Sequence, residues 1–349
     1  MLNKQLFLEG TPRMTIEIDS TMELSDGKFH ALMGPEPTPA FTEHGELESV
    51  WGRRWGAADE IGKLRTVLMR RPSRGLAKIT EDKFDEELGA LVDPARRWYW
   101  TGRDAPDLAM VDAQYQGFVD TLEANGVEVV FAPEMGETFT KSVYTRDPLI
   151  TIPGGAIIGR VAPRMRRGEE QSITQTVAAV GMPILGTVTG TGLAEGGSFV
   201  KVRKDLAFFG TSVRCNPEGY RQLARILEEQ GITLKQVNLP GYLIHLDMCS
   251  VMLDDNLALV NPRLAPYDYM TALWDLGIET LEVDRSEEWA CNMLVLEPRK
   301  VIMPDHLPRT HAMLQDKAGI DITAIPFREI LKNGGGLHCS TMELQRDWA

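Results

Sequence analysis

Residues 227–235 read LEEQGITLK: a charged, helix-like stretch ends at Gly231, and a short run typical of a strand begins directly after it. A glycine just past a helix end takes the left-handed conformation that terminates the helix. The pattern occurs five times, in LEANGVEVV, AAVGMPIL, LEEQGITLK, WDLGIETLEV and DKAGIDITAI, with its glycine at Gly126, Gly181, Gly231, Gly277 and Gly319. Intervals of 55, 50, 46 and 42 residues between these glycines indicate an internal repeat.

The repeats also begin alike, with two short apolar strands joined by a charged or Gly-containing turn. Examples are GSFVKVRKDLAFFG (197–210), SVMLDDNLALVN (250–261) and NMLVLEPRKVIM (292–303). A helical pattern such as PEGYRQLARILEEQG (217–231) follows, so the unit is strand, strand, helix, strand. No single unit can bury both faces of its sheet. Five units therefore predict a five-fold pseudosymmetric α/β propeller, with small sheets around an axis, helices outside and any ligand on the axis.

In this interpretation, residues 56–349 form one catalytic domain. Residues 1–55, rich in Pro, Glu and Thr, precede the first unit as an arm or extra lobe, and the sequence does not reveal their role.

Composition narrows the class of ligand. The 349 residues carry a net charge of −13, which argues against nucleic acid and anionic membranes as partners because both require clustered Lys and Arg. A small cationic ligand is compatible with this charge. The sequence shows neither a signal-peptide pattern nor a run of about 18 apolar residues, so we expect a cytoplasmic protein without membrane spans. The oligomeric state stays open, a homo-oligomer included.

Four motifs place polar groups where the repeat should be apolar or turn-like. They are YTRDP with Asp147, AEGGSF with Glu195, IHLDMC with His245 and Asp247, and GGGLHC with Cys339. The run IHLDMC reads as a strand, in which residues two apart share a face. We therefore expect His245 and Asp247 to project together. Either residue alone would more simply be a hydrogen-bonded core group, but the set of four motifs favours chemistry.

The four cysteines are too widely spaced for a C-x-x-C pair and too few for a disulfide scaffold. They are Cys215, Cys249, Cys291 and Cys339. Cys249 and Cys291 lie in apolar runs, where buried structural thiols are expected. Cys339 follows three glycines and is flanked by His338 and Ser340, which fits a presented thiol. Local sequence alone leaves its role open between catalytic and structural.

The ordered set TRD, EGG, HLD and GGG-x-HC resembles the guanidino-group-modifying superfamily, which has the pentein or amidinotransferase fold. This superfamily includes arginine deiminase, dimethylargininase, arginine dihydrolase and the amidinotransferases. The resemblance covers about residue 60 to the C-terminus. It implies a cysteine-dependent hydrolase that cleaves a C–N bond of the guanidino group of arginine or a substituted arginine, through a covalent S-amidino intermediate. The small-molecule partner would be a guanidino amino acid.

The resemblance also implies roles for individual residues. Cys339 would be the nucleophile and His245 the general acid and base, while Glu195 holds His245. Asp147 and Asp247 would clamp the guanidinium. A guanidinium carbon is a poor electrophile, so it requires a thiolate to attack it and carboxylates to fix its plane. This route implies no cofactor and no metal.

Two arginines complete the expected site. In the deiminase and dimethylargininase branches, arginines after the first acidic motif and after EGG bind the substrate's α-carboxylate. Arg166 lies 19 residues after Asp147, and Arg214 lies 19 residues after Glu195. We therefore expect Arg166 and Arg214 to hold a carboxylate at the end of the pocket opposite to the aspartates, unless Arg166 belongs to a solvated basic loop.

The sequence departs from individual branches. Asn333 and glycines stand where deiminases carry an arginine, and Ser340 stands where amidinotransferases place an aromatic residue. The HLD pair favours the deiminase and dihydrolase branches over dimethylargininase, which lacks the second acid. Two alternatives remain open: an amidinotransferase that passes the amidino group to an amine, and a non-catalytic pentein that only binds. The retained Cys339, His245 and acids argue against the binding module.

Overall fold

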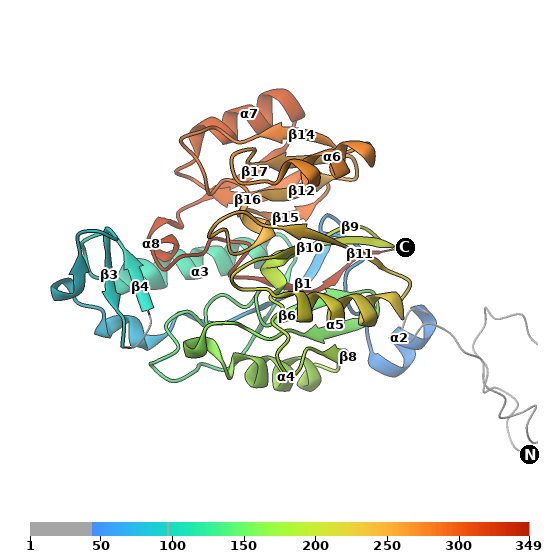
Figure 1. Cartoon of the computed structure of the whole chain (residues 1–349), viewed down its shortest axis with the longest axis horizontal. Helices are drawn as coiled ribbons and strands as arrows, with labels where there is room; N and C mark the ends of the chain where they lie inside the picture. Colours follow the sequence, from blue (N-terminus) through green and yellow to red (C-terminus); the bar gives the residue numbers. More distant parts are fainter. Residues whose placement is uncertain (1–43, 96–97, 349) are drawn as a thin grey trace, which may run out of the picture.

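The structure, a computed structural model, describes residues 44–95 and 98–348. The predicted repeat is confirmed, and the sheets surround a common centre with helices outside them (Figure 1). Four sheets each use three consecutive strands: β6 (Leu149–Ile152), β7 (Gly155–Ile158) and β8 (Ile184–Thr187); β9 (Phe199–Arg203), β10 (Leu206–Thr211) and β11 (Thr233–Asn238); β12 (Ser250–Asp254), β13 (Leu257–Val260) and β14 (Glu279–Glu282); β15 (Leu294–Glu297), β16 (Lys300–Pro304) and β17 (Asp321–Ile325). The middle strand pairs antiparallel with the first and parallel with the third.

The fifth sheet closes the ring with strands from both ends of the described chain. Its order is β18 (Met342–Arg346), β1 (Leu64–Met69) and β5 (Glu128–Phe131). Strand β18 pairs antiparallel with β1, in the place that a hairpin partner takes in the other units. The prediction that every unit begins with its own hairpin is therefore wrong for the first unit. The closing strand also leaves β1 paired along both edges, which protects it from adventitious strand addition.

One helix precedes the last strand of each sheet. These are α3 (Leu108–Ala124), α4 (Glu169–Ala179), α5 (Pro217–Glu228), α6 (Tyr267–Asp275) and α7 (Pro308–Ala318). The five repeat glycines follow them with φ between +61° and +86°, as the sequence predicts. Helix α5 shows how a helix is held, because Leu223, Ile226 and Leu227 on one face are buried in a cluster with residues of the same unit and of the preceding one. Each such side chain contributes on the order of 1.5–3 kcal/mol.

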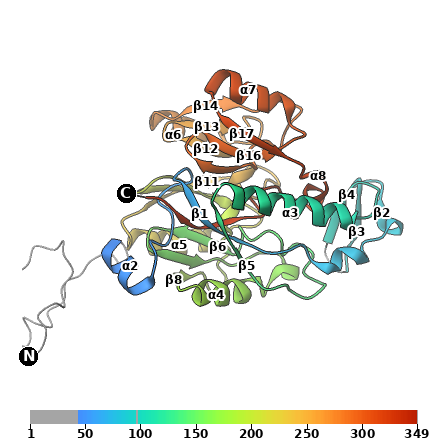
Figure 2. The same cartoon turned by 180° about the vertical axis from the view of Figure 1, so that it is seen from behind.

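A sixth, antiparallel sheet lies outside the ring and was not predicted. It consists of β2 (Phe84–Asp85), β3 (Ala90–Asp93) and β4 (Trp98–Thr101), inserted between β1 and α3. Figure 2 shows it beside one end of α3 and close to α8 (Arg328–Leu331). The Thr101 amide donates to the Lys332 carbonyl at 2.8 Å, so the insertion contacts the segment that leads into Cys339.

Short 3-10 helices and one further α-helix complete the described elements. They are α2 (His44–Trp51), η1 (Arg74–Lys78), η2 (Glu81–Lys83), η3 (Arg164–Arg166), η4 (Gly196–Ser198) and η5 (Leu246–Met248). Leu47 of α2 packs with Ala58 and Trp348. Most of the predicted N-terminal arm, residues 1–43, lies outside the described residues, and the division at residue 55 stays a prediction.

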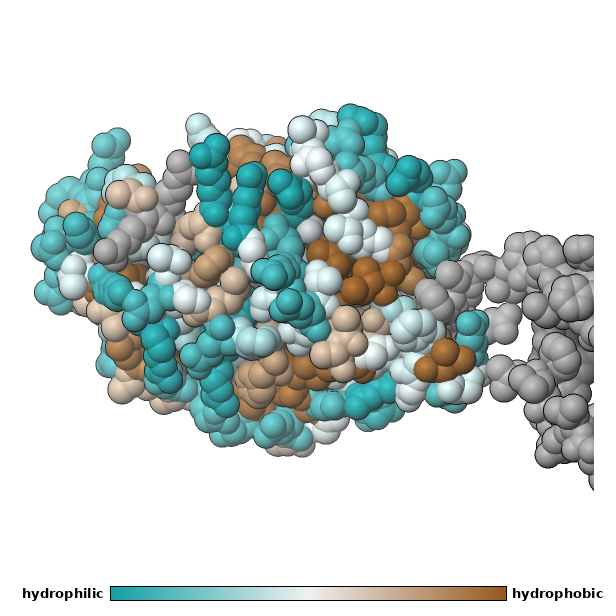
Figure 3. Space-filling view, turned by 90° about the horizontal axis from the view of Figure 1, so that it is seen from below, coloured by the Kyte–Doolittle hydropathy of each residue, from teal (hydrophilic) through white to brown (hydrophobic). Residues whose placement is uncertain are grey.

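The described helices are all too short or too polar to cross a bilayer. On the face in Figure 3, hydrophilic side chains are interspersed with smaller apolar areas.

Candidate active site

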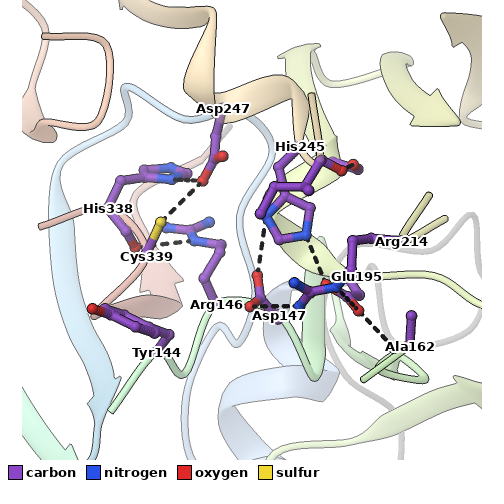
Figure 4. A network of polar contacts seen from close by, with 12 residues as sticks. Tyr144, Arg146, Asp147, Ala162, Glu195, Arg214, His245, Asp247, His338 and Cys339 are labelled. Atoms are coloured by element: carbon purple, nitrogen blue, oxygen red, sulfur yellow. Dashed lines mark hydrogen bonds and ion pairs between the residues drawn. The ribbon is translucent and has the colours of Figure 1, made fainter. Parts of the chain in front are cut away.

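The repeat brings the polar motifs together because each precedes the first strand of a unit. Asp147, Glu195, His245 and Cys339 each lie two to five residues before β6, β9, β12 and β18, respectively. These strand entrances meet near the centre of the ring, and Figure 4 shows the side chains converging there. All four residues are at least nine-tenths buried.

The run IHLDMC is not the predicted strand. His245 has extended backbone, residues Leu246–Met248 form the 3-10 helix η5, and β12 begins only at Ser250. Alternating apolar and polar residues also suit a buried turn, so this pattern could not distinguish a strand from a short 3-10 helix. As a consequence, His245 and Asp247 reach different parts of the network in place of sharing one strand face (Figure 4).

His245 is held between two acids. Its Nε2 lies 2.7 Å from Glu195 Oε2, and its Nδ1 lies 3.6 Å from Asp147 Oδ1. Burial opposes the charged imidazolium, but Asp147 and the hydrogen bond with Glu195 outweigh it and raise the pKa of His245. His245 is therefore poised to carry a proton near neutral pH. Gly197 makes this placement possible, since a Cβ there would lie 2.6 Å from His245 Nδ1.

Glu195 and Asp147 stay ionised. Burial alone would raise both pKa values. His245, Arg166 and Arg214 outweigh it for Asp147 and lower its pKa to about 2. Arg214 and His245 lower the pKa of Glu195. Glu195 is thus a fixed anion that orients the imidazole ring.

Arg166 and Arg214 form ion pairs with buried carboxylates of the site. This differs from the prediction, in which the arginines and the aspartates lie at opposite ends of the pocket. Arg166 hydrogen-bonds Asp147 through Nη1, and its Nε and Nη2 form a fork with Glu169 at 2.9 and 2.8 Å. Arg214 lies against Glu195, with Nε and Nη2 at 2.9 and 2.7 Å, and its Nη2 lies 3.8 Å from Asp147. Both arginines line the cavity, so substrate binding by them stays a prediction. Arg166 is not part of a solvated loop, because its side chain is only 4% exposed.

Cys339 contacts Asn292, which lies just before β15 in the neighbouring unit. Asn292 Nδ2 lies 3.1 Å from the Cys339 sulfur, and Asn292 Oδ1 accepts from the Cys339 amide at 3.3 Å. Gly336 leaves room for this contact, since a Cβ there would lie 2.6 Å from Asn292 Oδ1. Burial, followed by Asp247 and Asp147, raises the pKa of the thiol well above its usual value. These surroundings favour the neutral thiol beside two carboxylates.

Asp247 lies on the other side of the sulfur. Its Oδ2 is 3.8 Å from Cys339 Sγ and 2.8 Å from His338 Nδ1. Burial lowers the pKa of His338, so its ring favours the neutral form with Nδ1–H donating to Asp247. Asp247 Oδ1 and Asp147 Oδ1 are both buried and accept no hydrogen bond from the residues that the structure describes. Asp147 Oδ1 has only the longer ion pair with His245, so both carboxylates can accept further hydrogen bonds.

A cavity of about 130 Å³ opens onto this network. Tyr99, Lys141, Tyr144, Met248 and Trp289 line it together with the arginines, His245, Asp147 and Cys339. At roughly 10–15 Å³ per water-sized sphere, it holds a ligand of on the order of ten non-hydrogen atoms.

Asp147, Glu195 and His245 could in principle hold a metal ion, because one ligand atom from each lies within 4.8 Å of the others. Both carboxylates already face guanidinium groups of Arg166 and Arg214, however. Two fixed cations disfavour a divalent ion there. The expectation that no metal is required stays a prediction.

Sequence reasoning missed Asn292, Lys141 and the role of His338. Asn292 offered a usable signal: it stands two residues before β15, the entrance that the other candidates occupy in their own units. Lys141 offered no such signal, since its partners come from β4 and from the loop before Cys339.

Two known proteins are similar to this chain over most of its length. N(G),N(G)-dimethylarginine dimethylaminohydrolase from Pseudomonas aeruginosa is 29% identical over 237 residues, covering 68% of this chain and 89% of the relative. A 2-nitroimidazole nitrohydrolase from Mycobacterium sp. is 24% identical over 338 residues, covering 86% of this chain and 84% of the relative.

Solved structures share the fold. The Pseudomonas aeruginosa enzyme complexed with citrulline has a TM-score of 0.66 at 24% identity and covers 81% of this chain and all of the other. An amidinotransferase from Microseira wollei has a TM-score of 0.67 at 18% identity and covers 84% of this chain and 98% of the other. The propeller is thus the pentein fold.

The model of one family, described as N,N dimethylarginine dimethylhydrolase, eukaryotic, matches residues 105–346, which include every candidate residue above. The chain therefore belongs to the dimethylarginine dimethylhydrolase family.

Proposed function

We propose that the protein hydrolyses a C–N bond of the guanidino group of arginine or a substituted arginine, with Cys339 as nucleophile. Family membership makes the chain a hydrolase acting on guanidino C–N bonds. The observation that carries the proposal is a pair of buried carboxylates at the Cys339 thiol: Asp247 Oδ2 lies 3.8 Å from the sulfur, and Asp147 lines the same cavity as Cys339, with Oδ1 in only a long ion pair of 3.6 Å with His245. A planar guanidinium offers N–H donors to such acceptors, whereas an amine offers a single point of attachment.

The bound substrate would activate the nucleophile. Besides burial, the charges of Asp247 and Asp147 raise the pKa of the thiol, and a bound guanidinium would neutralise these two charges. A cation in contact with the sulfur favours the thiolate, and Asn292 supplies a donor to it at 3.1 Å. Ionisation of the Cys339 thiol would thus be coupled to the binding of a cationic substrate.

The reaction then follows in two steps. The thiolate attacks the guanidinium carbon, and the C–N bond to the departing amine breaks as His245 gives that nitrogen a proton. This leaves an amidino group on Cys339. Neutral His245 takes a proton from water, which adds to the same carbon, and the C–S bond breaks to return the thiolate and a ureido product. Glu195 keeps the ring oriented in both steps.

The test compares wild type with Cys339→Ser on arginine and Nω-methylated arginines, with citrulline, urea and released amine as products. We expect the variant to fold and to show no turnover, because a hydroxyl is far less ionised than a thiol. Intact-mass measurement after acid quench should show one amidino adduct on wild type only. Turnover by Cys339→Ser above a few per cent of wild type would remove Cys339 from this role.

A transferase is the second candidate, because a structural neighbour is an amidinotransferase. Adding glycine or another amine to the same assay distinguishes the two, since a transferase forms a new guanidine in place of the ureido product or urea.

A relative that matches 86% of this chain, a 2-nitroimidazole nitrohydrolase, motivates a third assay. Its substrate carbon also lies between two nitrogens, so nitrite release from 2-nitroimidazole should be measured in parallel. The buried carboxylates favour the cationic guanidine over this neutral ring.

A further inference from the structure

Lys141 is an ammonium group built into the wall of the cavity. Its Nζ donates to the Tyr99 carbonyl at 2.7 Å and to the Asn333 carbonyl, and it lies 3.8 Å from the centre of the Tyr99 ring. The residue is only 7% exposed and forms no ion pair with any residue in the described ranges. A buried cation without a counter-ion is costly, so this position calls for an anion from the ligand.

The surrounding charges act against the ammonium form of Lys141, which a carboxylate of the ligand would favour. Burial, followed by repulsion from Arg166 and Arg214, lowers the pKa of Lys141 well below its usual value. The arginines differ from Lys141 because both already face carboxylates, Glu169 and Asp147 for Arg166 and Glu195 for Arg214. An ammonium has three N–H bonds, and two of those of Lys141 are given to carbonyls. One N–H is thus left for a ligand.

Lys141 also occupies the backbone carbonyls at this wall, although the buried Asn333 Oδ1 accepts no hydrogen bond from the described residues. The carbonyls of Tyr99 and Asn333 already receive its protons, and its own charge would repel a second ammonium nearby. The wall around Lys141 therefore suits a carboxylate and opposes a free amino group.

We propose that Lys141 holds the carboxylate of an ω-guanidino acid and that the site disfavours guanidines with a free ammonium at that end. The inference rests on the proposed reaction and shifts its substrate from free arginine to guanidino acids whose α-amino group is absent or acylated, so that free arginine would be a weakly bound substrate. Lys141 is then a specificity-determining residue, while Cys339 and His245 carry the chemistry.

Four matched guanidines separate the two charges: butylguanidine has neither group, agmatine has the amine, 5-guanidinopentanoate has the carboxylate, and arginine has both. Their dissociation constants are measured by calorimetry on Cys339→Ser, so that no turnover interferes. We expect 5-guanidinopentanoate to bind at least about 10-fold more tightly than arginine or agmatine. If the protein with Lys141 in place binds arginine and 5-guanidinopentanoate with equal affinity, the inference is wrong. This comparison requires no substitution of Lys141.

Lys141→Met in the same background should weaken binding of 5-guanidinopentanoate by about 10- to 100-fold and leave butylguanidine unchanged. Lys141→Arg keeps the charge and should retain discrimination between 5-guanidinopentanoate and agmatine. The control is Lys201→Met, which removes another buried lysine, whose Nζ lies 3.4 Å from the Ala57 carbonyl and which does not line the cavity. An unchanged affinity ratio in Lys141→Met refutes the carboxylate subsite.

The two proposals fail differently. If none of the four guanidines binds and wild type turns none over, the proposed function is wrong and the inference falls with it. If butylguanidine binds but the carboxylate adds nothing, only the role of Lys141 is wrong.

Discussion

Replacing Asn292 by leucine tests how the nucleophile is held. Asn292 places Nδ2 3.1 Å from the Cys339 sulfur, a contact that lowers the thiol's pKa against the opposing effect of burial. A hydrogen bond to a charged group is worth about 1.5–3 kcal/mol, and one pKa unit corresponds to about 1.4 kcal/mol. Its loss should therefore raise the pKa of Cys339 by about one to two units, since the thiolate loses a donor and the neutral thiol loses little.

The assay is the pH dependence of Cys339 alkylation by iodoacetamide, followed by mass spectrometry. The other three cysteines are at most 1% exposed, so Cys339 at 7% is the expected site of reaction in the folded protein, and Cys339→Ser gives the background. Below its pKa, the alkylation rate of Asn292→Leu should fall by about 10- to 100-fold, and the midpoint should move to higher pH. The control is Asn261→Leu, which removes another buried asparagine, bonded to the Arg263 amide and the Glu288 carbonyl. An alkylation midpoint that does not move refutes the idea that Asn292 stabilises the thiolate.

Three further predictions concern charge. Glu195→Gln removes an anion that raises the pKa of His245, so the imidazolium should lose its proton at lower pH and the alkaline limb of the kcat profile should shift downward; an unshifted limb contradicts this. Burial and the charge of Glu343 raise the pKa of Glu60 from 4.5 to about 8, so the folded protein loses stability as pH rises through this window. Glu60→Gln should flatten the fall in Tm between pH 5 and 8.5, and an unchanged slope would show that Glu60 is not the group responsible. Dialysis against a chelator should leave activity intact, and a loss restored by one specific metal would reverse our view of Asp147, Glu195 and His245.

The fold was largely predictable because its signals are local. A glycine after a helix and two short apolar strands before it recur in sequence order, and all five glycines take the expected positive φ. The closure by β18 was not predictable from such signals, because the pairing of Leu64 with Arg346 joins segments far apart in the sequence.

The site was predictable in residue type and less so in geometry. Asp147, Glu195 and His245 form one group of contacts, and Asp247 and Cys339 form a second group beside it, so the motifs did predict which residues meet at the centre. The spacing of 19 residues predicted that Arg166 and Arg214 occupy equivalent positions in two repeats. It could not show that Arg166 forms an ion pair with Glu169 and Arg214 with Glu195. Likewise, nothing near Lys141 in sequence pointed to its contacts with β4 and the glycine loop.

The ring closure has a consequence for the C-terminal segment of the chain. Cys339 stands three residues before β18, the strand that completes the first sheet by pairing with β1. Every other candidate residue lies earlier in the sequence. A chain that lacks the segment after β17 would therefore contain the acids and the histidine but not Cys339, and one edge of β1 would be unpaired. Under the proposed function, the same C-terminal segment supplies the nucleophile and completes the first sheet, so its loss would remove both together.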